Sequence, residues 1–265
     1  MPYPIAEIGG SGPPLHMAVA NGFPPDTYRP LLEPLAARCR VVSLPPRPLW
    51  PDPPPPGELR SWRTLADDLL CGLRAHNLEE VIAVGHSMGG VFSLLAALAE
   101  PGRFRALVLL DPTILPPRFM AAIRAARALG LEVRLPLVQG ALKRRARFAD
   151  VDEAYGYWRA RPLFRGWPDE TVRLYAQSMT RPAPEGGLVL AYPPEWEARI
   201  YRTIPTDLWR EVPKLDGLLP VLVIRGSATN TFVEASARRF QRLVPGAALA
   251  VVEGQPAQDR GEIDL

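Results

Sequence analysis

The sequence contains very few cysteine, histidine and lysine residues. Only two of its 265 residues are cysteine and only three are histidine. Neither Cys39 nor Cys71 has metal-ligand spacing to another cysteine or to a histidine, so we expect neither a disulfide framework nor a metal site. The first residues lack the basic and apolar regions of a signal peptide. Because thiols stay reduced inside the cell, we expect a cytoplasmic protein.

The sequence also lacks long apolar runs and a strong excess of one charge. No apolar run approaches the length of a membrane span, and 47% hydrophobic residues are typical of a soluble globular protein. The formal net charge is only +3. The basic cluster Lys143–Arg147 has no interleaved aromatic residues, and we interpret it as a solvated helix face or a loose anion contact. We therefore expect neither nucleic acid nor a membrane as a partner.

The most informative stretch is Glu79–Gly90, with the sequence EEVIAVGHSMGG. Val81–Val84 is an apolar run typical of a buried strand, and Val91–Leu98 continues as a helix. Between them, GHSMG fits the pattern G-x-S-x-G. A strand, this pattern and a helix in that order indicate a nucleophile elbow, in which a sharp turn holds Ser87 at the end of a sheet. The turn leaves no room for side chains two positions away from the serine, which explains the glycines.

Apolar and polar residues alternate in a pattern that predicts further strands and helices. The expected strands are 3–8, 15–20, 40–44, 81–84, 104–110, 219–224 and 247–252. The expected helices are 27–38, with leucines 31, 32 and 35 on one face, and 61–76, 91–98 and 233–243. Residues 45–57 are too rich in proline for either element and predict a rigid loop near the mouth of the site. This order predicts an α/β fold with a mostly parallel central sheet and helices on both faces.

Residues 113–205 interrupt this alternation with a helical stretch rich in arginine and aromatic residues. We find no strand signal in it and interpret it as a helical cap, inserted into a core formed by residues 1–112 and 206–265. Some of its aromatic side chains would line a pocket and others would form the core of the cap: Tyr155, Tyr157, Trp158, Phe164, Trp167, Tyr175, Tyr192 and Trp196.

The chain resembles the α/β-hydrolase fold family, in its serine-esterase-like group with a helical cap. The resemblance rests on Gly85–Gly90 as the nucleophile motif, on His16–Pro24 as the oxyanion loop, and on the strand ends at Asp111 and Arg225. It implies that Ser87 attacks an acyl carbonyl. It also implies an oxyanion hole formed by the backbone N–H groups of Met88 and Phe23, with Asn21 where the family often has histidine.

The other members of the expected catalytic triad are missing from their usual positions. Asn230 stands where the family has its acid, and no histidine lies near 254–257. Asp111, at the end of the preceding core strand, is a possible alternative acid or a structural Asp-Pro turn. An asparagine in place of the acid lowers kcat by about 10⁴, and an oxyanion hole with substrate binding alone retains roughly 10³–10⁴ over water.

All three histidines precede the serine or adjoin it, and each has a structural interpretation. His16 begins a buried strand, and His76 ends the 61–76 helix, where a cation suits the last carbonyls. His86 neighbours Ser87, but consecutive side chains at such a turn point apart. We therefore expect no histidine in the role of the base.

Three functions remain open at this stage. One is a serine hydrolase for esters or similar acyl substrates, impaired by its incomplete triad. Another is a non-catalytic protein of the same fold that binds a small apolar ligand or a protein partner. The third is a different reaction on this fold, such as that of a lyase or a cofactor-independent oxygenase. We expect no metal or other cofactor, and the residues carry no signal for an oligomeric state.

Overall fold

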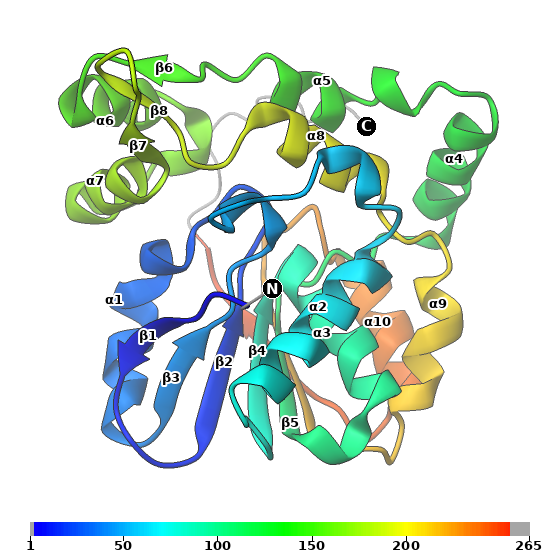
Figure 1. Ribbon diagram of the computed structural model, residues 1–265. Coiled ribbons are helices and arrows are strands. Elements are labelled where there is room, and N and C mark those ends of the chain that lie inside the picture. Colours follow the sequence, from blue (N-terminus) through cyan, green and yellow to red (C-terminus); the bar gives the residue numbers. More distant parts are fainter. Residues whose placement is uncertain (1–2, 255–265) are drawn as a thin grey trace.

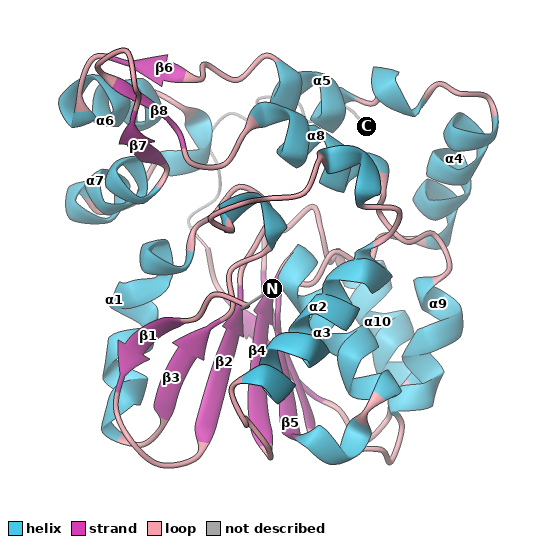
Figure 2. Ribbon diagram, in the orientation of Figure 1, coloured by secondary structure: helices cyan, strands magenta, loops and turns pink. Residues whose placement is uncertain are grey.

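The computed structural model describes residues 3–254, and its centre is a seven-stranded sheet with the order β1-β3-β2-β4-β5-β9-β10. The strands are β1 (Ala6–Gly9), β2 (Pro14–Ala18), β3 (Arg40–Ser43), β4 (Val81–His86), β5 (Phe104–Leu110), β9 (Val221–Gly226) and β10 (Ala248–Val252). β1 pairs antiparallel with β3, and every other neighbouring pair in this sheet is parallel. The expected fold class, a mostly parallel α/β sheet, is confirmed (Figures 1 and 2).

The two faces of the sheet belong to different clusters of apolar side chains. In β4, Val81 and Ala83 pack into the larger cluster, whereas Ile82 and Val84 contact the smaller one. Alternate residues of a strand point to opposite faces, so a continuous apolar run such as this one marks a strand covered on both sides. The larger cluster also contains residues of α2 (Trp62–Ala75), α3 (Met88–Ala99) and α10 (Glu234–Leu243).

The expected helix at residues 27–38 is only partly correct. The structure has two 3₁₀ turns, η1 (Pro25–Tyr28) and η2 (Glu33–Ala37), around a single α-turn, α1 (Arg29–Leu32). Pro30 and Pro34 lack the N–H that would continue an α-helix. As a result Leu32 alone of the three leucines is buried, while Leu31 and Leu35 are exposed.

Residues 113–205, which follow β5 and form the upper segment, lie over the carboxyl ends of the sheet strands (Figure 1). It adds no strand to the seven-stranded sheet. Its longer helices are α4 (Pro117–Ala128), α5 (Pro136–Leu142), α6 (Val151–Arg159), α7 (Asp169–Ser178) and α8 (Pro194–Arg202). It is followed by the short helix α9 (Leu208–Glu211). The expectation that it contains no strand is wrong, because β6 (Arg147–Phe148), β7 (Thr180–Pro182) and β8 (Leu188–Leu190) form a small antiparallel sheet. These strands are two or three residues long, too short for an alternating pattern to reveal.

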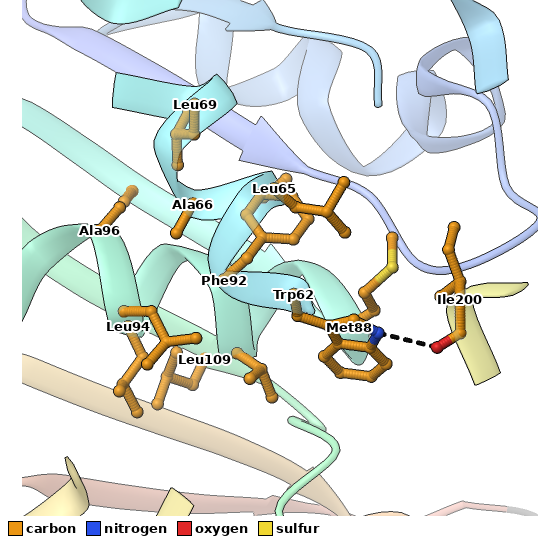
Figure 3. Packing of buried hydrophobic residues seen from close by; sticks show 14 of the residues in the cluster. Trp62, Leu65, Ala66, Leu69, Met88, Phe92, Leu94, Ala96, Leu109 and Ile200 are labelled. Carbon is orange, nitrogen blue, oxygen red and sulfur yellow. Dashed lines mark hydrogen bonds between the residues drawn. The ribbon is translucent and has the colours of Figure 1, made fainter. Parts of the chain in front are cut away.

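Helix α2 joins this upper segment to the sheet. Ser61 caps its N-terminus by accepting a hydrogen bond from Arg63 N–H. The predicted helix 61–76 thus includes the capping residues at both ends of α2. The Trp62 ring is 1% exposed, and its indole N–H donates to the Ile200 carbonyl of α8 at 2.9 Å (Figure 3). Figure 3 also shows Met88 beside this ring. Replacing such a buried tryptophan by alanine costs about 3–5 kcal/mol, so this contact contributes strongly to fixing α8 above the sheet.

The proline-rich loop at residues 45–57 contains two 3₁₀ turns, η3 (Arg47–Leu49) and η4 (Pro56–Glu58). Arg47 forms two hydrogen bonds to the Asp68 carboxylate of α2, at 2.5 and 2.8 Å. At the far end of the loop, Arg199 of α8 donates to the Gly57 carbonyl at 3.2 Å. The loop thus connects α2 with α8. The positions near 254–257, where the resemblance implies a histidine, lie mostly outside the described residues.

Candidate functional site

Ser87 occupies a sharp turn between β4 and α3, as the elbow pattern predicts. Its backbone has φ 53° and ψ −115°, a conformation that residues with a side chain rarely adopt. Its N–H donates to the Leu110 carbonyl of β5 at 2.9 Å. A Cβ atom added to Gly85 would lie 2.5 Å from the Gly89 oxygen, and one added to Gly89 would lie 2.1 Å from the Ala18 oxygen. Steric crowding at both positions therefore explains the two glycines of the motif.

The Ser87 hydroxyl is half-buried, and its hydrogen-bonding partner is Thr113, with 2.9 Å between Oγ and Oγ1. His86 faces a different group: its Nδ1 lies 2.8 Å from the Tyr28 hydroxyl. Burial lowers the pKa of His86, and the nearby Asp111 opposes this shift. The His86 ring thus contacts Tyr28, and its burial disfavours the charged form.

The two remaining histidines have structural partners far from the serine. The His16 ring is fully buried and its Nε2 accepts the Leu44 N–H at 3.0 Å. Burial lowers the pKa of His16 to about 3, so the ring is uncharged at neutral pH. His76, at the C-cap of α2, has its Nε2 2.8 Å from the Tyr3 carbonyl. Each of the three histidine rings thus lies within hydrogen-bonding distance of a group other than Ser87.

Asp111 follows β5 directly and lies beside Ser87, because His86 and Leu110 are register partners in neighbouring strands. Its φ is 44°, and its Oδ2 accepts hydrogen bonds from Thr229 at 2.5 Å and Thr231 at 2.8 Å. Its Oδ1 is buried and has no hydrogen-bond partner among the described residues. Asp111 therefore holds the loop after β9 against the end of β5, the strand next to β4.

The structure places Asn230 away from this carboxylate. The Asn230 side chain is exposed, whereas the threonines on either side of it turn toward Asp111. The resemblance implied the acid position at Asn230, and Asn230 lies between the two threonines that bind Asp111. Sequence reasoning missed Thr229 and Thr231, for which the Thr-x-Thr spacing around Asn230 is the only signal.

The two N–H groups that the resemblance implies as oxyanion donors differ in the hydrogen bonds that they form within the chain. Met88 is the first residue of α3, where a backbone N–H has no carbonyl four residues earlier within the helix. The Phe23 N–H, in contrast, donates to the Ala20 carbonyl at 3.2 Å and closes a turn. Phe23 therefore has to leave this long hydrogen bond before it can donate to a substrate.

The Ala20–Phe23 loop is bound from above by the segment between β5 and β9. Tyr192 donates to Asn21 Oδ1 at 2.8 Å, and Asn21 Nδ2 donates to the Glu197 carbonyl at 3.1 Å. Tyr175 donates to the Gly22 carbonyl at 3.0 Å. All three hydrogen bonds are buried. Asn21, at the position where the resemblance suggests a histidine, is thus a structural link to the layer above the site.

An ion pair lies directly above this loop. Arg144 donates to Glu197 at 2.8 Å, and the side chains are 21% and 3% exposed. Burial raises the pKa of Glu197, and the Arg144 guanidinium opposes this shift. A Cβ atom at Gly22 would lie 3.3 Å from Arg144 Nη1, so the pair touches the loop. The interpretation of Lys143–Arg147 as a solvated helix face is therefore wrong for Arg144, because spacing within a basic cluster does not show which member faces a carboxylate distant in sequence.

Aromatic rings surround the Phe23 side chain. Its ring centroid lies 5.1 Å from that of Tyr175, 6.2 Å from that of Trp167 and 6.4 Å from that of Tyr28. Several other rings of the upper segment are buried and form its core: Trp158, Phe164, Tyr192 and Trp196. Thus Trp167 and Tyr175 contact the Ala20–Phe23 loop through their rings, and Tyr192 contacts it through its hydroxyl.

Within residues 3–254, no group of three or more His, Cys, Asp or Glu side chains is arranged to hold a metal ion. In the same range, no helix combines the length and the apolar character needed to cross a membrane.

These features, namely the strand order, the strained serine between β4 and α3 and the loop that faces it, agree with comparisons to known proteins. A sequence model of the Alpha/beta hydrolase family matches residues 15–255. The chain belongs to this family. The resemblance noted in the sequence is thereby confirmed.

Two curated relatives are similar to this chain over somewhat more than two thirds of its length. It is 27% identical over 193 residues to the 2-(acetamidomethylene)succinate hydrolase of Mesorhizobium japonicum, covering 71% of this chain and 62% of the relative. It is 29% identical over 194 residues to the non-heme chloroperoxidase CPO-A1 of Kitasatospora aureofaciens, covering 72% and 65%. The matched part of the chain thus spans less than two thirds of the length of these relatives.

Solved structures show the same fold. The crystal structure of E-2-(acetamidomethylene)succinate hydrolase superposes with a TM-score of 0.77 at 23% identity, over 96% of this chain and 87% of that one. The thioesterase domain from the curacin biosynthetic pathway gives a TM-score of 0.73 at 18% identity, over 96% and 88%. At these identities the likeness concerns the architecture.

Proposed function

We propose that this chain is a serine hydrolase of esters or similar acyl substrates, with Ser87 as its nucleophile and a strongly reduced rate. The observation that carries the proposal is the conformation of Ser87, whose φ of 53° places its hydroxyl at the end of β4 and the start of α3. Strained backbone of this kind costs about 1–3 kcal/mol and persists mainly at functional sites. The hydrolase names of relatives in the same family support the class of reaction.

The proposed reaction begins with attack of Ser87 Oγ on the acyl carbon. The Oγ–C bond forms, the carbonyl electron pair moves onto oxygen, and the hydroxyl proton leaves to water. The negative oxygen is stabilised by the Met88 N–H at the start of α3 and by the Phe23 N–H. The carbonyl then re-forms as the bond from carbon to the leaving oxygen breaks, and the leaving oxygen takes a proton from water. A second water later attacks the acyl-serine, which releases the acid and returns a proton to Ser87 Oγ.

The rate is low in this proposal because each of the three histidines is engaged elsewhere. Without an imidazole, no side chain takes the serine proton or returns it to the leaving group. Support for Asp111 as the acid comes from its position at the end of β5, next to β4, and from Thr229 and Thr231, which hold its carboxylate in place. The proposal therefore retains Asp111 as the acid of the site and assigns no role in proton transfer to the exposed Asn230.

The division into a core of residues 1–112 and 206–265 and a cap of residues 113–205 is part of the same proposal. The cap would cover the substrate, and Trp167 and Tyr175 beside Phe23 favour a small apolar acyl group. A cytoplasmic location belongs to the proposal as well, and Cys39 and Cys71 are free thiols.

A second candidate function is binding without turnover, of a small apolar ligand or a protein partner. It is favoured by one observation, the hydrogen bond of Ser87 to Thr113 in place of a base. A fluorophosphonate reagent distinguishes the two functions, because it labels only a serine that is still nucleophilic. We expect slow labelling of one site in intact-mass spectra, absent in Ser87→Ala. No labelling in the unaltered chain, with a ligand that raises its melting temperature, would favour the binding function.

A further inference from the structure

The Tyr28 hydroxyl connects the nucleophile turn with the oxyanion loop. It lies 2.8 Å from His86 Nδ1, and it accepts the Ala20 N–H at 3.1 Å. His86 directly precedes Ser87, and Ala20 begins the turn that Phe23 closes. Tyr28 ends η1, only five residues after Phe23. One hydroxyl group therefore bridges the two chain segments that carry the proposed oxyanion donors.

The hydrogen-bonding chemistry gives each group in this bridge a defined role. A tyrosine hydroxyl has one hydrogen and can also accept. Since it already accepts from Ala20, its own hydrogen is available for an imidazole nitrogen that carries a lone pair. The half-buried His86 ring is uncharged at neutral pH, so its Nδ1 can accept from Tyr28. The Tyr28 and His86 rings also pack edge to face, with 5.8 Å between centroids.

The bridge complements the contacts that bind the loop from the other side. Tyr175 and Tyr192 hold Gly22 and Asn21 to the upper segment, whereas Tyr28 holds Ala20 to the nucleophile turn. Without Tyr28, the loop would be linked to the nucleophile strand only through the pairing of β2 with β4, which ends at Ala18 and Gly85. With Tyr28, hydrogen bonds fix the position of the loop relative to the turn that carries Ser87 and Met88.

We propose that His86 and Tyr28 are positioning residues, which set the spacing between the Phe23 and Met88 N–H groups through the Ala20 backbone. This inference rests on the proposed function, since the spacing matters only if an oxyanion forms there. It gives the histidine of the GHSMG motif a role that is distinct from proton transfer. Oxyanion donors act only within a narrow range of distance, so a small shift of the loop lowers the rate of attack.

The first test measures the rate at which a fluorophosphonate modifies Ser87 in the full chain, separated into a maximal rate and a half-saturating concentration. We expect Tyr28→Phe to lower the maximal rate by about 10- to 100-fold and to leave the half-saturating concentration unchanged. The matched control is Tyr155→Phe, a half-buried tyrosine of α6 whose ring lies on Arg173, and we expect it to behave like the unaltered chain. An unchanged maximal rate in Tyr28→Phe would overturn the proposal.

A rescue experiment separates positioning from general loss of stability. An asparagine at position 86 offers a side-chain oxygen that can accept from Tyr28, whereas a leucine offers none. We expect His86→Asn to retain most of the labelling rate and His86→Leu to lose it, although both remain folded by circular dichroism. Equal rates in the two variants would contradict a role for the hydrogen bond.

A second measurement does not depend on reactivity at Ser87. In ¹H–¹⁵N spectra, His86→Leu should shift the amide resonances of Ala20 and Phe23, which Tyr155→Phe should leave in place. If these shifts occur but Ser87 of the unaltered chain takes no label, the bridge exists and the proposed hydrolase function fails. If Ser87 is labelled and the Ala20 and Phe23 resonances stay unchanged, the bridge is wrong and the hydrolase function stands.

Discussion

The strained backbone of Ser87 predicts how substitutions at position 87 change the free energy of unfolding. With φ 53° and ψ −115°, this residue lies where glycine is favoured, because its mirror-image conformation is ordinary extended backbone. Strain of this kind costs about 1–3 kcal/mol. A glycine at position 87 would relieve it, whereas an alanine would retain it. Both variants lose the same hydroxyl and its bond to Thr113, so the difference between them isolates the backbone.

The expected difference in unfolding free energy between Ser87→Gly and Ser87→Ala is the relieved strain energy minus the entropic cost of glycine. This cost arises because glycine makes the unfolded chain more flexible. That entropy is worth about 0.4–1 kcal/mol. We therefore expect Ser87→Gly to be more stable than Ser87→Ala by about 1 kcal/mol, the relieved strain less this entropy. Unfolding in urea, followed by the fluorescence of the six tryptophans, gives both free energies by linear extrapolation.

Ser93 provides the matched control, because it lies within α3, six residues further along the same helix. There the backbone is helical, and glycine costs about 1 kcal/mol relative to alanine. The difference in unfolding free energy between the glycine and the alanine variant should thus have opposite signs at positions 87 and 93. A Ser87→Gly variant that is less stable than Ser87→Ala would refute the reasoning about strain.

Three other substitutions test the buried polar groups around the site. Because the pKa of His16 is about 3 in the folded chain and near 6.5 when unfolded, its contribution to stability is complete above pH 6.5 and is lost as the pH falls toward 3. Between pH 7 and pH 5, unfolding in urea should show the unaltered chain losing about 2 kcal/mol relative to His16→Gln, and equal losses would contradict the buried neutral ring. Tyr192→Phe leaves Asn21 Oδ1 without its donor and should cost about 1–3 kcal/mol in the same assay, against little change for Tyr155→Phe. Arg144→Met leaves the buried Glu197 carboxylate without its cation and should cost about 3–5 kcal/mol at pH 8, with a smaller loss at pH 5, where protonation relieves the buried charge. A cost that does not depend on pH would argue against a charged Glu197 in the unaltered chain.

Elements that depend on residues close together in the sequence could be predicted from local patterns. The 61–76 helix was predictable from its apolar face and its serine cap, and the elbow at Ser87 from its spaced glycines. The interrupted helix near Leu32 shows the limit, because Pro30 and Pro34 outweigh the spacing of the leucines.

The arrangement around the site depends on contacts between residues far apart in the sequence. The bonds of Thr229 and Thr231 to Asp111 join residues more than one hundred positions apart, and Arg144 meets Glu197 across the upper segment. No periodicity in the chain encodes such pairs. The motif alone located Ser87, whereas only the structure shows that Thr229 and Thr231, on either side of Asn230, bind Asp111.

The central claim is that Ser87 attacks an acyl group, and trapping the acyl-serine tests it most directly. The chain would be mixed with p-nitrophenyl acetate, quenched in acid and digested, and the peptide that contains residue 87 examined by mass spectrometry. We expect one acetyl group on Ser87, formed slowly, and none in Ser87→Ala. Release of p-nitrophenolate at the same rate by both proteins, with no acetyl group at position 87, would contradict the claim.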